Sequence, residues 1–249
     1  MASGQPIPLR PVKADGSKVD PVETVECRTC GAGAPVDEHF CPNCSRILAL
    51  GRHGDYFTFF GLPRALTIDA ADLERRFREL SRKFHPDYFY NAPPAERLAS
   101  HERSSYLNDA YRALRNPVSR IEHLLAIEGL PPAKSEEGTA KVPPGLLEEV
   151  FALNEELDEI RELRESGTAP GELASRLETA RQPIEVKRQA HEEQLRQLSE
   201  RWDAQCDTAS PQEKRATLEA LRERLLERNY INNLLASIDR EKAHTGERA

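Results

Sequence analysis

Residues 75–87 read RRFRELSRKFHPD, a basic amphipathic run that stops at the tripeptide His85, Pro86 and Asp87. Pro86 has no N–H to donate and biases the residue before it toward extended backbone angles, so a helix ends and a loop begins here. The tripeptide alone has a plain interpretation as a turn that stops a helix. Its meaning therefore depends on the segments on either side.

Two helical runs flank the loop. In residues 69–84 the apolar side chains recur at helical spacing, which predicts a helix with one packed face and one charged face. On the charged face, three arginines at i, i+3 and i+7 form a positive stripe toward the loop, namely Arg75, Arg78 and Arg82. Apolar residues of 107–114 repeat at helical spacing until Asn116-Pro117 ends the run. The two runs predict an antiparallel helical hairpin with the tripeptide in its connecting loop.

The composition limits the class of protein. The chain has 249 residues, of which 38% are hydrophobic and 31% charged, as expected for a soluble, mainly α-helical protein with one large domain or two to three small ones. No segment approaches a membrane span, and a net charge of -7 disfavours nucleic acid, so neither is an expected partner. Residues 1–25 are expected to be a disordered leader, neither a secretory signal nor an obvious presequence. This favours the bacterial cytoplasm, with the mitochondrial matrix as the alternative.

Four of the five cysteines form two CxxC pairs separated by ten residues. Each pair is typical of a turn with converging thiolates, and four thiolates complete a tetrahedral zinc shell in a segment too small for a core of its own. We predict a zinc-ribbon-like module at 26–50, with structural Zn²⁺ held by Cys27, Cys30, Cys41 and Cys44. The alternatives are a rubredoxin-like iron site, two disulfides or a redox dithiol. Whether the module also pairs two chains into a homodimer stays open.

Two residues outside this set are given simpler roles. His39, two residues before Cys41, is expected to be an ordinary surface histidine, because four cysteines already fill the shell. Cys206 follows Trp202 on a helical run and is expected to be a buried packing residue.

An aromatic segment, DYFTFFGLP at 55–63, precedes the basic helix and is interpreted as a short amphipathic helix that closes the core. Together with the His-Pro-Asp loop, LNDAY at 107–111 and NPVSRIEHLL at 116–125, it resembles the HscB type of J-domain co-chaperone. The resemblance spans about 55–239. It implies a J-domain at 54–128 and a linker at 129–145, and the cysteine module resembles the N-terminal extension of some family members.

The resemblance also implies a partner for the loop. In J-domains the basic helix and the His-Pro-Asp loop dock on the ATPase domain of a heat-shock seventy-kilodalton-class chaperone, here of the HscA or DnaK type. The residues that carry this role over are His85, Pro86, Asp87, Arg75, Arg78 and Arg82.

The C-terminal part predicts an antiparallel three-helix bundle at 146–240, followed by a flexible tail at 241–249. From Leu146 the apolar positions advance by 4, 3, 4 and 3, the seam of a helix packed against others. Pro170-Gly171 opens a second run, which Pro183 is expected to kink. Ser210 to Glu213 form a capping box, with proline at the first helical position, that opens the third.

One line of the first bundle helix lies beside this seam, at 147, 151, 155 and 159. Residues 146–165 hold eight acidic side chains against two basic, so the surface should attract a basic partner. Alternatively, Leu147 and Phe151 widen the buried stripe and the rest is a solvated charged face. From the residues alone both interpretations stay open.

In HscB proteins the first and third bundle helices bind the iron–sulfur scaffold protein, of the IscU type. The resemblance carries this role to Leu147, Phe151, Glu155, Glu159 and Tyr230. Two positions depart from the family pattern, since Glu148 stands where an apolar residue is usual and Ala152 where an acidic one is.

The expected function is that of a co-chaperone without enzymatic activity of its own. It would deliver the scaffold to the chaperone and stimulate ATP hydrolysis, which drives cluster transfer. The nearest alternative is a general J-protein whose bundle binds another client. An enzyme using His85 and Asp87 as an acid–base pair lacks a nucleophile or pocket signature, and a zinc-ribbon nucleic-acid binder lacks basic–aromatic interleaving.

Overall fold

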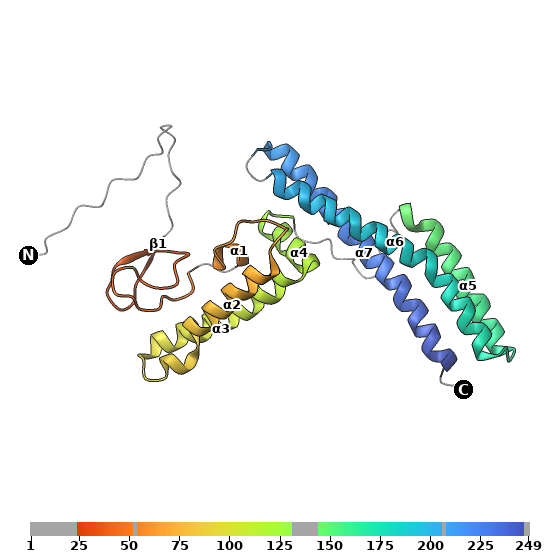
Figure 1. Ribbon diagram of the computed structural model, residues 1–249, viewed down its shortest axis with the longest axis horizontal. Coiled ribbons are helices and arrows are strands. Elements are labelled where there is room, and N and C mark those ends of the chain that lie inside the picture. Colours follow the sequence, from red (N-terminus) through yellow and green to blue (C-terminus); the bar gives the residue numbers. More distant parts are fainter. Residues whose placement is uncertain (1–23, 52–53, 131–143, 206–207, 247–249) are drawn as a thin grey trace, which may run out of the picture. The chain divides into compact units, whose positions relative to one another are not determined.

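The computed structural model describes residues 24–51, 54–130, 144–205 and 208–246. Most of the predicted leader, most of the predicted linker and Cys206 lie outside these ranges. The fold is mainly α-helical with a small N-terminal four-cysteine module, as predicted (Figure 1). Two compact units can be distinguished. One holds the described residues up to Asp55 together with Phe77–Asp109, and the other holds Tyr56–Arg76 and the described chain from Ala110 onward.

The cysteine module of the first unit is built on a short antiparallel pair of strands. Strand β1 (Thr24–Glu26) pairs with β2 (Gly33–Pro35), so that Val25 lies opposite Ala34. β1 begins inside the stretch predicted as leader, because its backbone groups find partners in β2. The core of the module is very small and consists of Cys27, Ala34, Cys41 and Leu48.

The first unit also contains the tip of the predicted hairpin. Helix α2 (Ala70–Phe84) ends at the residue before His85, a short 3₁₀ helix η1 (Pro86–Phe89) follows, and α3 (Pro94–Arg115) leads back. The backbone carbonyl of Phe84 accepts hydrogen bonds from the hydroxyls of Ser100 (2.6 Å) and Ser104 (2.9 Å). The last carbonyl of α2 is therefore satisfied by α3, which fixes where the loop begins.

Helices α1 (Tyr56–Phe59) and α4 (Pro117–Ile127) belong to the second unit. Phe57 and Phe59 of α1 are buried, which confirms the interpretation of the aromatic segment. Asn116 caps α4, since its side-chain oxygen accepts the N–H groups of Val118 (2.9 Å) and Ser119 (3.2 Å). Asn116-Pro117 thus ends one helix and begins the next.

Three helices make up the C-terminal part. They are α5 (Leu147–Glu165), α6 (Pro170–Gln205) and α7 (Pro211–Gly246), with the 3₁₀ turn η2 (Pro144–Leu146) before α5. The predicted capping box is present, because the Ser210 N–H donates to the Glu213 carboxylate (2.8 Å) and the Glu213 N–H donates to the Ser210 hydroxyl (3.3 Å). α6 continues through Pro183, and the predicted kink there stays a prediction.

The bundle contains three helices over only part of its length, which the sequence did not indicate. α5 has 19 residues and α6 and α7 have 36 each, so α5 covers about half of the longer pair (Figure 1). The shared core joins α5, the first half of α6 and the second half of α7. Farther along, α6 and α7 pair as two helices around Leu195, Trp202, Leu218 and Leu221. None of the described helices is long and apolar enough to cross a membrane.

Candidate functional site

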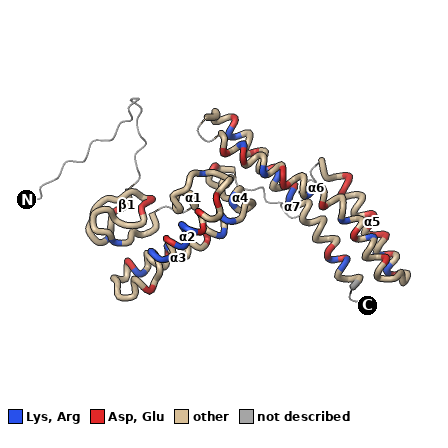
Figure 2. Tube along the Cα trace, viewed as in Figure 1, with Lys and Arg blue, Asp and Glu red and all other residues tan. Residues whose placement is uncertain are grey.

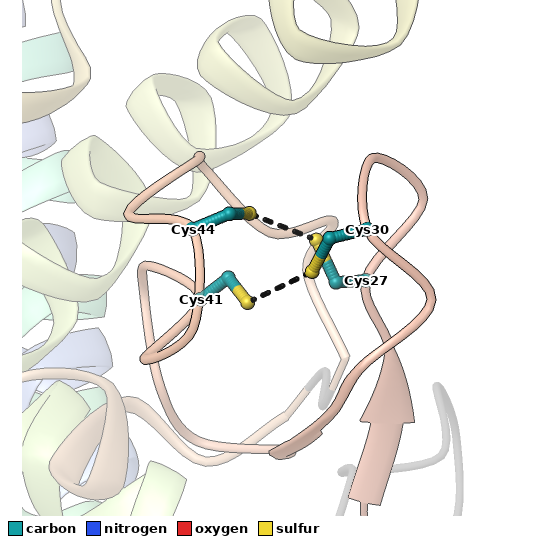
Figure 3. Close-up of side chains that lie close together, drawn as sticks. All are labelled: Cys27, Cys30, Cys41 and Cys44. Atoms are coloured by element: carbon teal, nitrogen blue, oxygen red, sulfur yellow. Dashed lines mark hydrogen bonds between the residues drawn. The ribbon is translucent and has the colours of Figure 1, made fainter. Parts of the chain in front are cut away.

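The four cysteines of the two CxxC pairs converge on one point, as Figure 3 shows. All four sulfur atoms lie within 4.8 Å of one another, and the closest pairs, Cys27–Cys44 and Cys30–Cys41, are each 3.7 Å apart. A tetrahedral site with zinc–sulfur bonds of about 2.3 Å has sulfur–sulfur edges of about 3.8 Å, whereas a disulfide needs about 2.05 Å. The arrangement therefore fits a four-thiolate metal shell and excludes the disulfide alternative.

The thiols of this cluster share their protons unevenly. Hydrogen bonds from the Asn43 side chain and the Ala32 N–H lower the pKa of Cys30 to about 6. The Arg46 N–H lowers the pKa of Cys44, but burial and the three neighbouring thiols together raise it to about 12. Four thiolates at this distance repel one another, so a bound cation would supply the compensating charge and release the remaining protons.

His39 is not part of the cluster, and its prediction as a surface histidine is wrong. The side chain is half-buried, and its ring lies edge-on to the Phe84 ring with a centroid distance of 5.0 Å. Its Nδ1 lies 2.7 Å from Nη1 of Arg103. A guanidinium only donates, so Nδ1 is the acceptor and the neutral ring carries its proton on Nε2.

The His-Pro-Asp loop presents two polar side chains on a fixed turn. His85 caps η1, because the Asp87 N–H donates to its Nδ1 (3.3 Å). Both side chains are exposed, by 51% for His85 and 86% for Asp87. With Nδ1 accepting this bond, neutral His85 carries its proton on Nε2 and offers a donor, while Asp87 offers an acceptor. The loop can therefore make directional hydrogen bonds to a docked partner.

Lys and Arg recur along α2, as Figure 2 shows, and they include the three arginines of the predicted stripe. Arg75, Arg78 and Arg82 are all exposed. Arg75 contacts the carboxylate of Asp72, and Arg76 binds the same group at 2.7 Å, so Arg76 and Arg75 lower the pKa of Asp72. The charge at Arg75 is thus partly neutralised. Positive charge nearer the loop comes from Arg78, Arg82 and Lys83.

The acidic and apolar line of α5 faces outward. Phe151 is 69% exposed and Leu147 39% exposed, which decides against the buried-stripe interpretation. Glu155 and Glu159 continue the line and are also exposed, and Figure 2 shows further acidic residues along α5. Tyr230 on α7 differs from these residues, because it is half-buried against the bundle core.

The two departures from the family pattern border a groove. Glu148 and Ala152 of α5 line a cavity of about 650 Å³ together with residues of α6 such as Thr179 and Pro183. On its α5 side Glu156 is bound to Arg176 of α6 (2.7 Å), which also holds Glu159 (2.6 Å). The small side chain at 152 leaves this groove open between the two helices.

Sequence reasoning missed three side chains that tie distant segments together. Asp203 of α6 accepts the N–H groups of Leu66 (2.6 Å) and Thr67 (2.7 Å), and Trp202 donates its indole N–H to the Arg64 carbonyl (2.8 Å). Arg103 of α3 is almost wholly buried against the cysteine module. Trp202 stands out as the one tryptophan of the sequence, but nothing local distinguishes Asp203 or Arg103 from other helical positions, since their partners lie far away in the chain.

The structure thus combines an exposed His-Pro-Asp turn between two helices with a C-terminal helical part and an N-terminal four-cysteine module. No protein-family model matches the chain. Among solved structures, the chain is similar to the crystal structure of human co-chaperone protein HscB, with a TM-score of 0.60 and 24% identity over 88% of this chain and 98% of that one. It is also similar to chaperone HscB from Vibrio cholerae, with a TM-score of 0.54 and 24% identity over 76% of this chain and 99% of that one. The chain thus has the HscB fold, which confirms at the level of fold the resemblance found in its sequence.

Proposed function

We propose that this protein is a co-chaperone of iron–sulfur cluster assembly. It binds a heat-shock seventy-kilodalton-class chaperone through the tip of its J-domain and an IscU-type scaffold protein through its bundle. The observation that carries the proposal is the exposed His85–Asp87 turn at the end of a basic helix, on a chain with the HscB fold. The protein acts by binding, and ATP hydrolysis takes place in the chaperone.

The J-domain surface supplies both attraction and direction. Arg78 and Arg82 attract an acidic surface of the ATPase domain, and this encounter weakens as salt increases. His85 and Asp87 then make the directional hydrogen bonds, while Pro86 fixes the backbone between them. The loop can stimulate hydrolysis only if it binds the hydrolysis-competent chaperone conformation more tightly than the resting one.

The scaffold surface combines one large exposed apolar side chain with surrounding negative charge. Phe151 and Leu147 provide apolar area, and Glu155 and Glu159 select a basic partner. Tyr230 supports this surface from α7, where it packs on the bundle core. A largely exposed phenylalanine next to a second apolar residue and flanked by acidic side chains matches an interface with an aromatic anchor and a charged rim, which favours a binding role for this face.

Zinc is the metal that best suits the cysteine module. Its four ligands are sulfur atoms and their spacing is tetrahedral, which Zn²⁺ prefers, with rubredoxin-like iron as the alternative. When bound, the metal would hold the two turns together and carry out no reaction.

The decisive experiment is the steady-state ATPase rate of the chaperone with this protein, with the scaffold, and with both. We expect each partner to stimulate the rate and the pair to stimulate it more than the sum of the two, since one protein bridges both. Stimulation by this protein that is unaffected by the scaffold would instead favour a general J-protein with another client. No stimulation at all would overturn the proposal.

A further inference from the structure

A single buried arginine joins the cysteine module to the helical tip. Arg103 of α3 is 1% exposed, and its guanidinium donates four hydrogen bonds to the module. Nε donates to the Leu48 carbonyl (2.8 Å), and Nη2 donates to the carbonyls of Glu38 (3.0 Å) and Ala49 (3.1 Å). Nη1 donates to Nδ1 of His39 (2.7 Å). Four acceptors from one module thus surround a charge that belongs to the J-domain.

This charge makes the contact costly to break. Burial lowers the pKa of Arg103 to about 10, partly opposed by the charge of Glu102, so the side chain stays protonated at neutral pH. A buried guanidinium is tolerated only where its donors are satisfied. If the module moved away, Arg103 would lose these acceptors together. One further ion pair spans the same contact, from Arg46 of the module to the buried Glu96 of α3 (3.5 Å).

Phe84 connects this contact to the loop. It is wholly buried and is the last residue of α2, directly before His85. The His39 ring meets it edge-on at 5.0 Å, the Phe40 ring stacks at 6.0 Å, and the Arg103 guanidinium lies 5.7 Å from its centroid. His39 and Phe40 immediately precede Cys41, one of the four metal-ligating candidates. A short run of packed side chains therefore leads from the metal centre to the His-Pro-Asp turn.

We propose that the cysteine module positions the His85–Asp87 turn, and that the hydrogen bonds of Arg103 hold the module against Phe84. If the proposed function holds, a consequence is that stimulation of the chaperone depends on the bound metal, and this consequence rests on that function. The reason is that the module has too small a core to keep its shape without a metal. Once the ligands separate, the segment 38–41 no longer packs on Phe84, and the turn that follows loses its support. The scaffold surface on α5 is outside this pathway and stays unchanged.

Amide hydrogen exchange of residues 84–90 in the full chain tests the proposal without any chaperone. We compare the metal-loaded protein, the same protein after chelation, and Arg103→Lys, which keeps the charge but cannot reproduce the planar fork of donors. We expect exchange in 84–90 to become about tenfold faster or more in both altered samples, and exchange in α5 to stay unchanged. Arg112→Ala, an exposed arginine on the same helix, is the matched control and should behave as the wild type.

The outcomes separate the two proposals. Faster loop exchange supports positioning even if the wild-type protein fails to stimulate a chaperone, a result that would sink only the proposed function. Unchanged exchange in 84–90 after the metal has been removed, in a protein whose helical circular dichroism is retained, would overturn the positioning role. If Arg103→Lys does not fold, the chelated wild-type protein still decides the question. Where both proposals hold, ATPase stimulation falls with metal loss while scaffold affinity does not.

Discussion

The tip of the α2–α3 hairpin and the C-terminal bundle hold their exposed surfaces in place by different means. At the tip, Phe84 precedes the loop and packs against the cysteine module, whose four sulfur atoms converge on one point. The buried guanidinium of Arg103 holds this contact together. In the bundle, α5 is held by a continuous aliphatic core with α6 and α7. The tip is stabilised by a few polar contacts and by the cysteine ligands, whereas the bundle is stabilised by the close packing of aliphatic side chains. The two surfaces should therefore respond to different perturbations.

Loss of a metal ligand gives the largest expected effect and is confined to the tip. Cys41→Ser removes one thiolate, and zinc binding supplies small zinc modules with about 10–16 kcal/mol of apparent free energy. We expect loss of bound metal by elemental analysis and collapse of the module, with thermal unfolding of the bundle unchanged. Cys206→Ser is the control and should retain the metal, because Cys206 lies outside the two CxxC pairs of the sequence. Full metal content in Cys41→Ser would refute the four-ligand site.

A cavity in the bundle core gives the next largest effect and should leave the tip alone. Leu177 is wholly buried in the shared core, so Leu177→Ala should lower the free energy of unfolding by about 2–5 kcal/mol in urea titrations. Val186→Ala changes an exposed residue of the same helix and should stay within about 0.5 kcal/mol of the wild type. Altered metal content in Leu177→Ala would show that the two regions are not independent.

Phe151→Ala tests the surface that the bundle supports. Because the side chain is 69% exposed, stability should change by less than about 0.5 kcal/mol. Its affinity for a purified IscU-type scaffold, measured by isothermal titration calorimetry, should fall roughly tenfold or more if this residue anchors the interface. Leu98→Ala, which removes an exposed leucine on α3, should leave that affinity unchanged. Equal affinities for Phe151→Ala and the wild type would remove α5 from the binding site.

The smallest effect is a pH dependence confined to the two-helix part. His191 is buried on α6 and its Nε2 lies 2.7 Å from the Arg224 carbonyl, and burial together with the charges of Arg224 and Arg228 lowers its pKa. The unfolded chain then binds this proton more readily than the folded one. Stability should therefore fall as the pH drops below about 6.5, the ordinary histidine value. In His191→Gln, the free energy of unfolding measured in urea should depend less on pH between about pH 7 and pH 5. An unaltered dependence on pH would show that His191 does not cause it.

The features that the sequence predicted correctly are those encoded within one or two turns. The spacing of apolar residues predicted α2 and the α5 seam, Pro86 predicted the end of α2, and the residues from Ser210 to Glu213 predicted the start of α7. The paired cysteines predicted their own convergence, because ligand chemistry demands it. The resemblance to HscB proteins predicted the fold, which the similarity to two HscB structures confirms.

The features that the sequence did not predict depend on partners far along the chain. Arg103 resembles any other helical arginine until the carbonyls of Leu48 and Ala49 meet it. The same holds for Asp203, whose acceptor role depends on two N–H groups more than a hundred residues away. The four cysteines correctly exclude His39 as a ligand, but its contacts with Arg103 and Phe84 depend on residues far along the chain. Likewise, α5 packs along only about half the length of α6 and α7. This arrangement depends on how the three helices pair and cannot be read from the sequence of one helix.

The central claim, that the tip recruits a chaperone while the bundle holds the cargo, is tested most directly by His85→Gln in the chaperone ATPase assay with scaffold present. The side chain is exposed, so the fold, the bound metal and the affinity for the scaffold should be those of the wild type. The account predicts that stimulation of ATP hydrolysis is lost while scaffold binding is retained. Wild-type stimulation by His85→Gln would contradict it.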